Sequence, residues 1–514
     1  MNSLVKKNKA LLLSFIAIIC CMTIITRYYY LYNQPYLWGP DAYYYALQIK
    51  YLVQTGMFKI ADRSLILPLM GLTSKLGFNY EQSILGWTIL IQLLFGFSLV
   101  IAQRLKHKRL SIFPSYFLLL YVIISPTLSY LCLAFPRYAF ALIFLPFWSL
   151  GFNNAKYWPI SIAAIILSGI SHLSMIGIAI LVITIALLRG DIRFRRFNIK
   201  TLFFFGFIFS LTLIVLVGRK YILLADFNRI SWDGLKPPLL TFFQRDGIQI
   251  ILKLEAFLSL AIICGVLLFR KSLMYDVKAG ALWSPFIIFL TLFPIGSGES
   301  MGISERLSLL LPAVTVCMSL GIYYLQPLVK KAIFIIISGG LILTIFAPNI
   351  YYHFVYPNKF NSEYLIYHQV TAAIEDKEIP MLIAHQGLNY FYKYQTMKES
   401  FPYEPEDHWP KDKIWRVVFG IRDSEWGYYL PEKHLWDSGF LLDLPGDYSL
   451  IREDVWNQFR NGVEQESQDP DLHYRVFNSW YNPNQKRPEF SRKRATGNNE
   501  GDEFSAYPRN FKLE

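Results

Sequence analysis

Two arginines that open apolar segments are candidates for binding a phosphate group. Arg137 opens one segment and Arg306 opens another. A planar guanidinium group can hold a phosphate through two parallel hydrogen bonds, and an arginine in the first turn of a helix adds its charge to free backbone N–H groups. Each arginine has a structural alternative: Arg137 could reach along a membrane interface, and Arg306 could pair with Glu299 or Glu305.

A histidine, His172, lies between two short apolar segments. Its neutral imidazole could donate a hydrogen bond to a sugar or a phosphate, and the alternative is a histidine satisfied inside a helical bundle. Ionisable groups close to a bilayer are costly and are usually functional. His172, Arg137 and Arg306 are therefore candidate substrate-binding residues, together with Glu299 and Glu305.

An acid, Asp41, stands in a stretch that is more polar than its apolar neighbours. The stretch reads WGPDAYYYALQIKYLVQTGMF from Trp38 to Phe58. Pro40 suits the first turn of a helix, and an acid beside it would lie at the positive end of the helix dipole, which favours an ionised carboxylate.

Apolar and polar side chains separate onto two sides of this predicted helix. One side carries Tyr45, Ile49, Leu52 and Val53, and the other carries Asp41, Tyr44 and Gln48. The pattern predicts an amphipathic helix at a membrane surface with a carboxylate in its first turn. The alternative is a loop helix in which Asp41 serves only as a helix-start residue.

The composition indicates a polytopic membrane protein. The 514 residues are 54% hydrophobic and only 17% charged, and the mean hydropathy is +0.32. The net charge of +13 does not indicate a nucleic-acid partner, because the lysines and arginines are concentrated in short links between apolar spans.

About eleven membrane spans are predicted. They are residues 10–27, 83–103, 111–133, 137–152, 158–171, 173–188, 201–218, 250–269, 281–295, 304–325 and 332–350. The first reads as an uncleaved span rather than a signal peptide. Basic links at 104–109, 189–200, 270–271 and 330–331 place the N-terminus in the cytoplasm. The links 28–82, 219–249 and 296–303 are then external, and Asp41, Arg137, His172, Glu299, Glu305 and Arg306 all fall on the outer side.

Three short spans predict a polar outer cavity, and the first external loop holds a further predicted helix. The spans 137–152, 158–171 and 173–188 are shorter than the roughly 20 residues that a bilayer requires, which is typical of helices that line a cavity. The first external loop, 28–82, holds a second interfacial helix at 64–75, with Leu65, Leu69, Leu72 and Leu76 on one stripe.

The composition changes to that of a soluble domain after the last span. Residues 379–387 read as a buried strand and turn, 388–398 as a helix and 415–421 as a second strand. We therefore divide the chain into a transmembrane domain at 1–350, an extracytoplasmic α/β domain at 351–481 and a polar tail at 482–514 that is predicted to be disordered.

Other chemistries lack their motifs in this sequence. No phosphate-binding glycine loop, zinc-protease motif or nucleophile elbow occurs, so no nucleotide cofactor is expected. The five cysteines lie in or beside apolar spans and predict neither disulfides nor a metal site. We place no residue as a metal ligand, although a divalent ion as a cofactor is left open.

The whole pattern resembles the GT-C-type integral membrane glycosyltransferases. The likeness covers about residues 10–350 and is most specific at Asp41 with the Tyr-Tyr-Tyr, Gln and Gly56 run behind it. In that family the matching acid is taken as catalytic base or acceptor-binding group, the donor is commonly a polyprenyl-phosphate sugar, and basic residues on later outer loops bind its phosphate. The resemblance implies that Asp41 is the base and that Arg306 binds the phosphate.

The sequence also departs from that family. Many members carry two acids in the first loop, whereas Ala42 follows Asp41 here and Asp62 is the nearest further acid. No Trp-Trp-Asp motif follows the spans, so protein N-glycosylation is not supported. The span of Arg137 followed by His172 also resembles the central segment of EpsG-like polysaccharide polymerases.

The expected function is transfer of a sugar, with inversion, from a polyprenyl-phosphate donor to a hydroxyl group of a lipid or glycan acceptor. The reaction would take place at the outer face of the plasma (inner) membrane, with the N-terminus cytoplasmic and the C-terminal domain extracytoplasmic. The alternatives are an EpsG/Wzy-like polymerase, a transporter of lipid-linked glycans and a non-enzymatic scaffold.

Overall fold

The chain divides into two structural units. The computed structural model describes residues 14, 17–18, 21–22, 24–39, 41–59, 64–106, 113–148, 150–153, 155–172, 175, 178–179, 235–244, 250–268, 283, 286–287, 290–291, 295–296, 303–320, 357–377, 381–383, 386–401, 414–419, 441–445 and 448–452. The first unit comprises residues 1–33 and 60–354, and the second comprises 34–59 and 355–514. The sequence-predicted C-terminal domain is thus joined by a segment of the first external loop.

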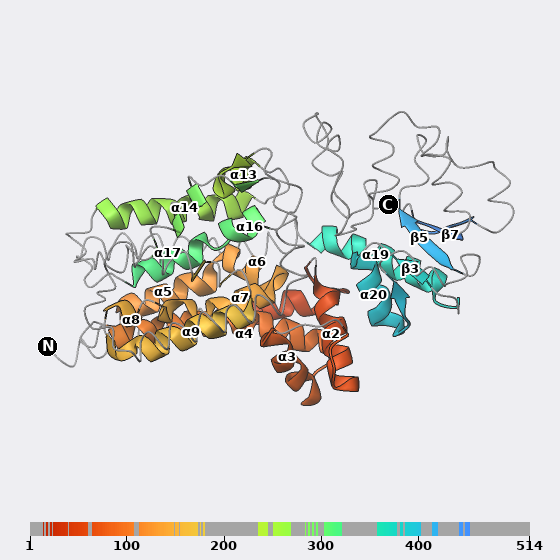
Figure 1. Ribbon diagram of the computed structural model, residues 1–514, viewed down its shortest axis with the longest axis horizontal. Coiled ribbons are helices and arrows are strands. Elements are labelled where there is room, and N and C mark those ends of the chain that lie inside the picture. Colours follow the sequence, from red (N-terminus) through yellow and green to blue (C-terminus); the bar gives the residue numbers. More distant parts are fainter. Residues whose placement is uncertain are drawn as a thin grey trace, which may run out of the picture. The chain divides into compact units, whose positions relative to one another are not determined.

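The first unit is built from helices of very different lengths (Figure 1). They are α3 (Ile66–Lys75), α4 (Tyr80–Lys106), α5 (Phe113–Ile124), α6 (Pro126–Ala134), α7 (Pro136–Leu142), α8 (Leu150–Asn153), α9 (Trp158–Ser171), α13 (Pro238–Gln244), α14 (Ile250–Leu268), α16 (Ile303–Ser308) and α17 (Leu311–Ser319). Two 3₁₀ turns, η1 (Leu145–Phe147) and η2 (Ala155–Tyr157), and a short ladder of β1 (Leu235–Lys236) with β2 (Ile295–Gly296) complete this unit.

Two helices in the described residues are long and apolar enough to cross a bilayer, namely α4 with 27 residues and α14 with 19. They match the predicted spans 83–103 and 250–269. At a rise of about 1.5 Å per residue, they extend for about 40 Å and about 28 Å. The spans 201–218 and 332–350 lie outside the described residues, so the count of eleven stays a prediction.

Helix α14 exposes large apolar side chains and buries polar ones. Ile250, Leu254 and Phe257 repeat at helical spacing and are all exposed, whereas Glu255 and Ser259 are buried. A water-soluble helix has the reverse arrangement, so this distribution is the one expected when the surrounding solvent is lipid.

A proline divides the predicted span 111–133 into α5 and α6. Pro126 has no backbone N–H, so the carbonyl of Val122 loses its helical donor. The side chain of Gln92 donates to that carbonyl instead. The next carbonyl, that of Ile123, accepts from the Arg27 guanidinium at 2.7 Å, and Arg27 also donates to the Gln92 side-chain oxygen.

The freed N–H groups on the other side of the break are satisfied too. The N–H of Thr127 donates to a carboxyl oxygen of Glu255 at 2.7 Å, and that of Leu128 donates to the hydroxyl of Ser125 at 3.0 Å. Arg27 therefore lies at the carbonyl end of α5 and Glu255 at the N–H end of α6, which matches the sign of each helix terminus. Two buried ionisable residues hold the broken helix in place.

Helix α3 confirms the predicted helix at 64–75. Its predicted stripe ends in Leu72 and Leu76, which are both exposed, while Ile66 and Met70 are fully buried on the other side. Contact of the exposed stripe with a membrane stays a prediction.

The two later external links of the predicted topology lie together in the first unit. Strand β1 from the link 219–249 pairs antiparallel with β2, whose second residue, Gly296, begins the link 296–303. Helix α13 packs on α16. Arg306 therefore lies on a helix, α16, that packs against a helix of the link 219–249.

The second unit contains a five-stranded mixed sheet. Its strands are β3 (Met381–Ile383), β4 (Ser400–Phe401), β5 (Trp415–Phe419), β6 (Leu441–Asp443) and β7 (Tyr448–Arg452), in the order β4-β3-β5-β7-β6. Strand β3 is parallel to β4 and β5, and β7 is antiparallel to β5 and β6. Helices α19 (Pro357–Ile374) and α20 (Gln386–Thr396) pack on each other, and α20 packs on β3 (Figure 1).

Three local predictions for this unit are confirmed within a few residues. The strand at 379–387 is β3, the helix at 388–398 is α20 and the strand at 415–421 is β5. The sequence reading missed α19, β4, β6 and β7, and the tail 482–514 lies outside the described residues.

The helix predicted around Asp41 is α2 (Ala42–Thr55), and it packs on α20. The ring centroids of Tyr44 and Tyr390 are 5.2 Å apart, and the Lys50 ammonium group donates to the carbonyl of Tyr394 at 2.6 Å. Lys50 places its charge at the carbonyl end of α20, where a cation is favourable.

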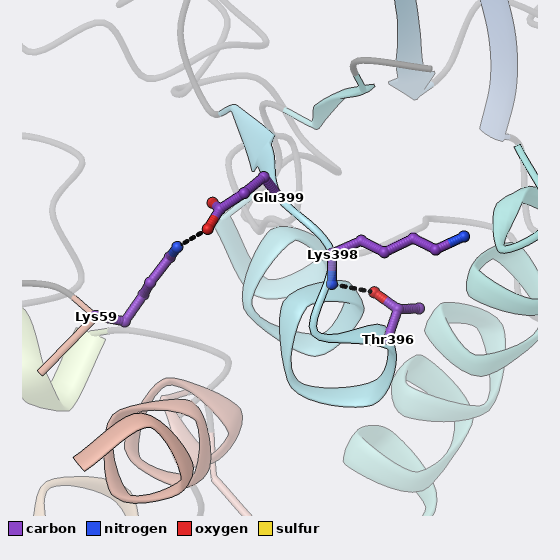
Figure 2. A network of polar contacts seen from close by, with 4 residues as sticks. All are labelled: Lys59, Thr396, Lys398 and Glu399. Carbon is purple, nitrogen blue, oxygen red and sulfur yellow. Dashed lines mark hydrogen bonds and ion pairs between the residues drawn. The ribbon is translucent and has the colours of Figure 1, made fainter. Parts of the chain in front are cut away.

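A second lysine joins the chain after α2 to the end of α20. Lys59 forms an ion pair with Glu399 (Figure 2). The backbone N–H of Lys398 donates to the Thr396 hydroxyl at 3.1 Å, while the Lys398 side chain extends away from the ion pair (Figure 2). Glu399 is 56% exposed, and ion pairs open to solvent contribute about 0–1 kcal/mol to stability.

Replacement of Glu255 should weaken the first unit. In Glu255→Ala, the buried N–H of Thr127 loses its acceptor, which costs about 1–3 kcal/mol. Glu255→Gln keeps an acceptor oxygen and should lose less. The measurement is the thermal unfolding midpoint of the purified chain in detergent, with Leu254→Ala, a change at the exposed neighbouring side chain, as control. Equal midpoints for wild type and Glu255→Ala would contradict this role.

Replacement of Lys393 should stabilise the second unit at neutral pH. Burial lowers the pKa of Lys393 from 10.5 to about 8, with nearby Lys59 adding to the shift and Glu399 opposing it. The unfolded chain then binds more protons between pH 8 and 10.5, so the free energy of unfolding rises with pH across that window, by about 3 kcal/mol in total. Below pH 8 the full cost of charging Lys393 is present.

Lys393→Met should therefore unfold at a higher temperature than wild type at pH 7, and this difference should shrink by pH 10. Lys398→Met removes an exposed lysine just beyond the same helix and should show no such pH-dependent difference. A constant difference between wild type and Lys393→Met at both pH values would refute the assignment.

Candidate functional site

Arg306 lies over an aromatic ring in the first unit. Its guanidinium carbon is 4.4 Å from the ring centroid of Phe135, a cation–π contact. Its Nε atom is buried and has no hydrogen-bond partner among the described residues. The guanidinium charge therefore lies over a ring that accepts no conventional hydrogen bond. Part of the hydrogen-bond donor capacity of Arg306 is unused.

Phe135 directly precedes the second arginine of the predicted site. It is the N-cap of α7, and Pro136 and Arg137 are the first residues of that helix. Pro136 ends α6 as Pro126 ends α5, because neither proline can continue the preceding hydrogen-bond ladder. The two breaks, ten residues apart, turn the chain so that Phe135 meets Arg306.

His172 adjoins the same short helix. Its ring centroid is 4.7 Å from that of Tyr138, the residue after Arg137. His172 is the C-cap of α9, and its backbone N–H donates to the carbonyl of Ser168 at 3.0 Å. Three predicted residues, Arg137, His172 and Arg306, are therefore linked through the neighbouring rings of Phe135 and Tyr138.

The other predicted residues of this unit are not described at side-chain level. Glu299 lies outside the described residues, and only the backbone of Glu305 is placed, in α16. The ion-pair alternative for Arg306 therefore stays a prediction. The N-terminus of α6 is not an anion site, because Glu255 already accepts from it.

Asp41 occupies the N-cap of α2 in the second unit. The helix begins at Ala42, so the acid stands one position before the first turn that was predicted for it, and Pro40 lies outside the described residues. The Asp41 side chain makes no capping hydrogen bond, although its carbonyl accepts from the N–H of Tyr45 at 3.2 Å. Its carboxylate oxygens are therefore not used to cap the helix.

Tyr44 and Gln48 lie one turn apart on α2 and contact each other. The Gln48 amide donates to the Tyr44 hydroxyl at 3.1 Å. The Tyr44 ring also meets Tyr390 of α20, a protein contact that the sequence reading did not foresee. Asp41, Tyr44 and Gln48 belong to the second unit and Arg137, His172 and Arg306 to the first, so their action on one substrate stays a prediction.

Comparisons with known proteins give a structural likeness. No protein-family model matches the chain, and no curated protein matches it. The crystal structure of ArnT from Cupriavidus metallidurans in the apo state matches with a TM-score of 0.52 at 12% identity, over 87% of this chain and 98% of that one. The structure of the same protein bound to undecaprenyl phosphate matches with a TM-score of 0.47 at 13% identity, over 70% of each chain. ArnT is a GT-C glycosyltransferase.

The chain has a GT-C-type fold. The predicted class, a GT-C-like helical membrane protein, is confirmed at this level. The GT-C-type fold also accounts for α4 and α14, whose lengths suit a bilayer, and for polar residues such as Glu255 that face the protein interior.

The sequence reading missed several residues that support the site. Glu255 was detectable, because it is a lone acid in an apolar span. Arg27 and Gln92 carried a weaker signal, since arginine and glutamine are common at span ends and on helix faces. Phe135 carried none, because an aromatic residue in an aromatic-rich chain is not distinctive.

The described residues hold no group of three or more histidine, cysteine, aspartate or glutamate side chains that could bind a metal ion. The sequence assigned no metal ligand, and the described residues add none.

Proposed function

We propose that this protein transfers a sugar from a polyprenyl-phosphate carrier to a hydroxyl group of a lipid or glycan acceptor at the outer face of the inner membrane. The observation that carries the proposal is the Arg306 guanidinium, held over Phe135 with its Nε unpaired and with Arg137 two residues further along. The shared fold with ArnT, which has been crystallised with undecaprenyl phosphate, supports the choice of carrier.

Arg306 is the proposed clamp on the phosphate of the donor. When the sugar leaves, negative charge builds on the phosphate oxygens, and a fixed guanidinium group stabilises that charge without having to reorganise. Arg137 is the second proposed cation, and His172 is the proposed hydrogen-bond donor to the sugar or phosphate. Glu299 and Glu305 complete the proposed binding set.

Asp41 is the proposed base. The oxygen of the acceptor hydroxyl forms a bond to the anomeric carbon, the bond from that carbon to the phosphate oxygen breaks with its electron pair, and Asp41 takes the hydroxyl proton. A single displacement of this kind inverts the anomeric carbon. Asp41 orients the hydroxyl group and takes its proton as the new bond forms.

Tyr44 and Gln48 are proposed to contact the acceptor. Both lie on the side of α2 that carries Asp41, one turn and two turns into the helix. Tyrosine offers a ring face for a sugar as well as a hydroxyl, and the Gln48 amide fixes the Tyr44 hydroxyl.

Removal of the proposed base should abolish transfer. Asp41→Asn keeps the size of the side chain but cannot take a proton, so the rate should fall by about 10²–10⁴-fold. The measurement is the initial rate of product formation in host membranes, followed by mass spectrometry of lipid-linked glycans at equal protein levels. Asp62→Asn, the nearest acid in the same loop, is the control and should keep its rate. An undiminished rate for Asp41→Asn would remove the base assignment.

Removal of the proposed clamp should weaken carrier binding. Hydrogen bonds to charged groups contribute about 1.5–3 kcal/mol, so Arg306→Ala should bind undecaprenyl phosphate about 10–100-fold more weakly. Arg306→Lys keeps the charge but not the planar fork and should recover only part of the affinity. The measurement is a titration of the purified chain in detergent, followed by tryptophan fluorescence.

Arg104 offers a matched control for Arg306. It is exposed, lies in the last turn of α4 and falls on the cytoplasmic side in the predicted topology. Arg104→Ala should bind the carrier as wild type does. Equal affinity in Arg306→Ala and Arg104→Ala would exclude Arg306 as the clamp.

A further inference from the structure

The turn before Asp41 is fixed by a tyrosine of α19. The hydroxyl of Tyr364 donates to the carbonyl of Gly39 at 2.6 Å, and Tyr364 is 2% exposed. The same carbonyl accepts from the N–H of Ala42 at 3.3 Å. Gly39 has a φ of 120°, a conformation that side chains of other residues disfavour, so the sequence at this turn is suited to glycine.

The residues on either side of Asp41 are held in the same way. The ring of Tyr43 lies 4.6 Å from the rings of both Tyr364 and Phe391, each edge to face. The Tyr43 hydroxyl accepts from the N–H of Leu37 at 3.3 Å. Hydrogen bonds therefore fix the backbone of Gly39, two residues before Asp41. Ring contacts and a hydrogen bond fix the side chain of Tyr43, two residues after it.

A third contact lies one turn earlier on α19. The side-chain amide of Asn361 donates to the Gln34 side-chain oxygen at 2.7 Å. Asn361 and Tyr364 are three residues apart, so both face the loop from one side of the helix. The contacts to this loop reach its backbone and flanking side chains, whereas Asp41 makes no capping bond with its own carboxylate.

We infer that Tyr364 is a positioning residue for Asp41 and that the α/β unit serves to hold the acid-bearing loop. This inference rests on the proposed function, since it assumes that Asp41 takes the proton. A misplacement of a reacting group by about 1 Å can cost about 10²-fold in rate, so one hydrogen bond to the turn before the acid has a large effect on catalysis. Tyr364 does not touch the substrate and acts through Gly39.

The test is the substitution Tyr364→Phe, which keeps the ring in its aromatic cluster and removes only the hydroxyl. It should lower kcat about 10-fold or more and leave the KM for host polyprenyl-phosphate sugar within about twofold. Amide hydrogen exchange of residues 37–43 in the purified full chain should become faster. Tyr367→Phe is the matched control: Tyr367 lies on the same helix, is fully buried, and donates to Glu363 rather than to the loop.

Two further results separate the inference from the proposed function. In an Asp41→Asn background, Tyr364→Phe should cause no additional loss of rate, because a positioning residue acts only through the group that it positions. An equal loss in both backgrounds, or unchanged exchange and kcat in Tyr364→Phe alone, would overturn the inference and leave the sugar-transfer proposal standing. An undiminished rate for Asp41→Asn would instead contradict the assignment of Asp41 as the base. That conclusion would not depend on the effect of Tyr364→Phe on amide hydrogen exchange.

Discussion

A proline within a helix of a membrane protein forces the rest of the first unit to satisfy the backbone groups that it frees. No water is available in the hydrocarbon core, so each freed carbonyl and N–H needs a partner from the protein. Here Gln92 and Arg27 serve the carbonyls of Val122 and Ile123, and Glu255 serves the N–H of Thr127. These three side chains hold the backbone at the break between α5 and α6.

The direction of α6 decides where the candidate phosphate site lies. The helix ends at Ala134, the next residue is Phe135, and Arg306 rests on that ring. The charged residues at the break and the charged residues at the site therefore have different roles, although both stand out as ionisable groups in an apolar chain. Arg27 and Glu255 are hydrogen-bonded to the backbone, whereas Arg306 keeps an unpaired Nε.

The sequence predicted the features that depend on local pattern. The length and apolar character of 83–103 and 250–269 predicted α4 and α14. Pro40 and Asp41 predicted the start of α2 within one residue. The break at Pro126 was missed because the segment 111–133 is apolar on both sides of it. The partner of α2 was missed because an aromatic side such as that of Tyr43 and Tyr44 looks the same in sequence whether it meets lipid or the rings of Phe391 and Tyr390.

The proposed function is the addition of one sugar to one acceptor. The most direct measurement is mass spectrometry of lipid-linked and surface glycans from cells with and without the gene. The account predicts that the deletion removes a single sugar from one glycan or glycolipid, with the unmodified acceptor and the sugar-loaded carrier both accumulating. A shift in the chain-length distribution of a polymer, or an unchanged set of glycans, would contradict it.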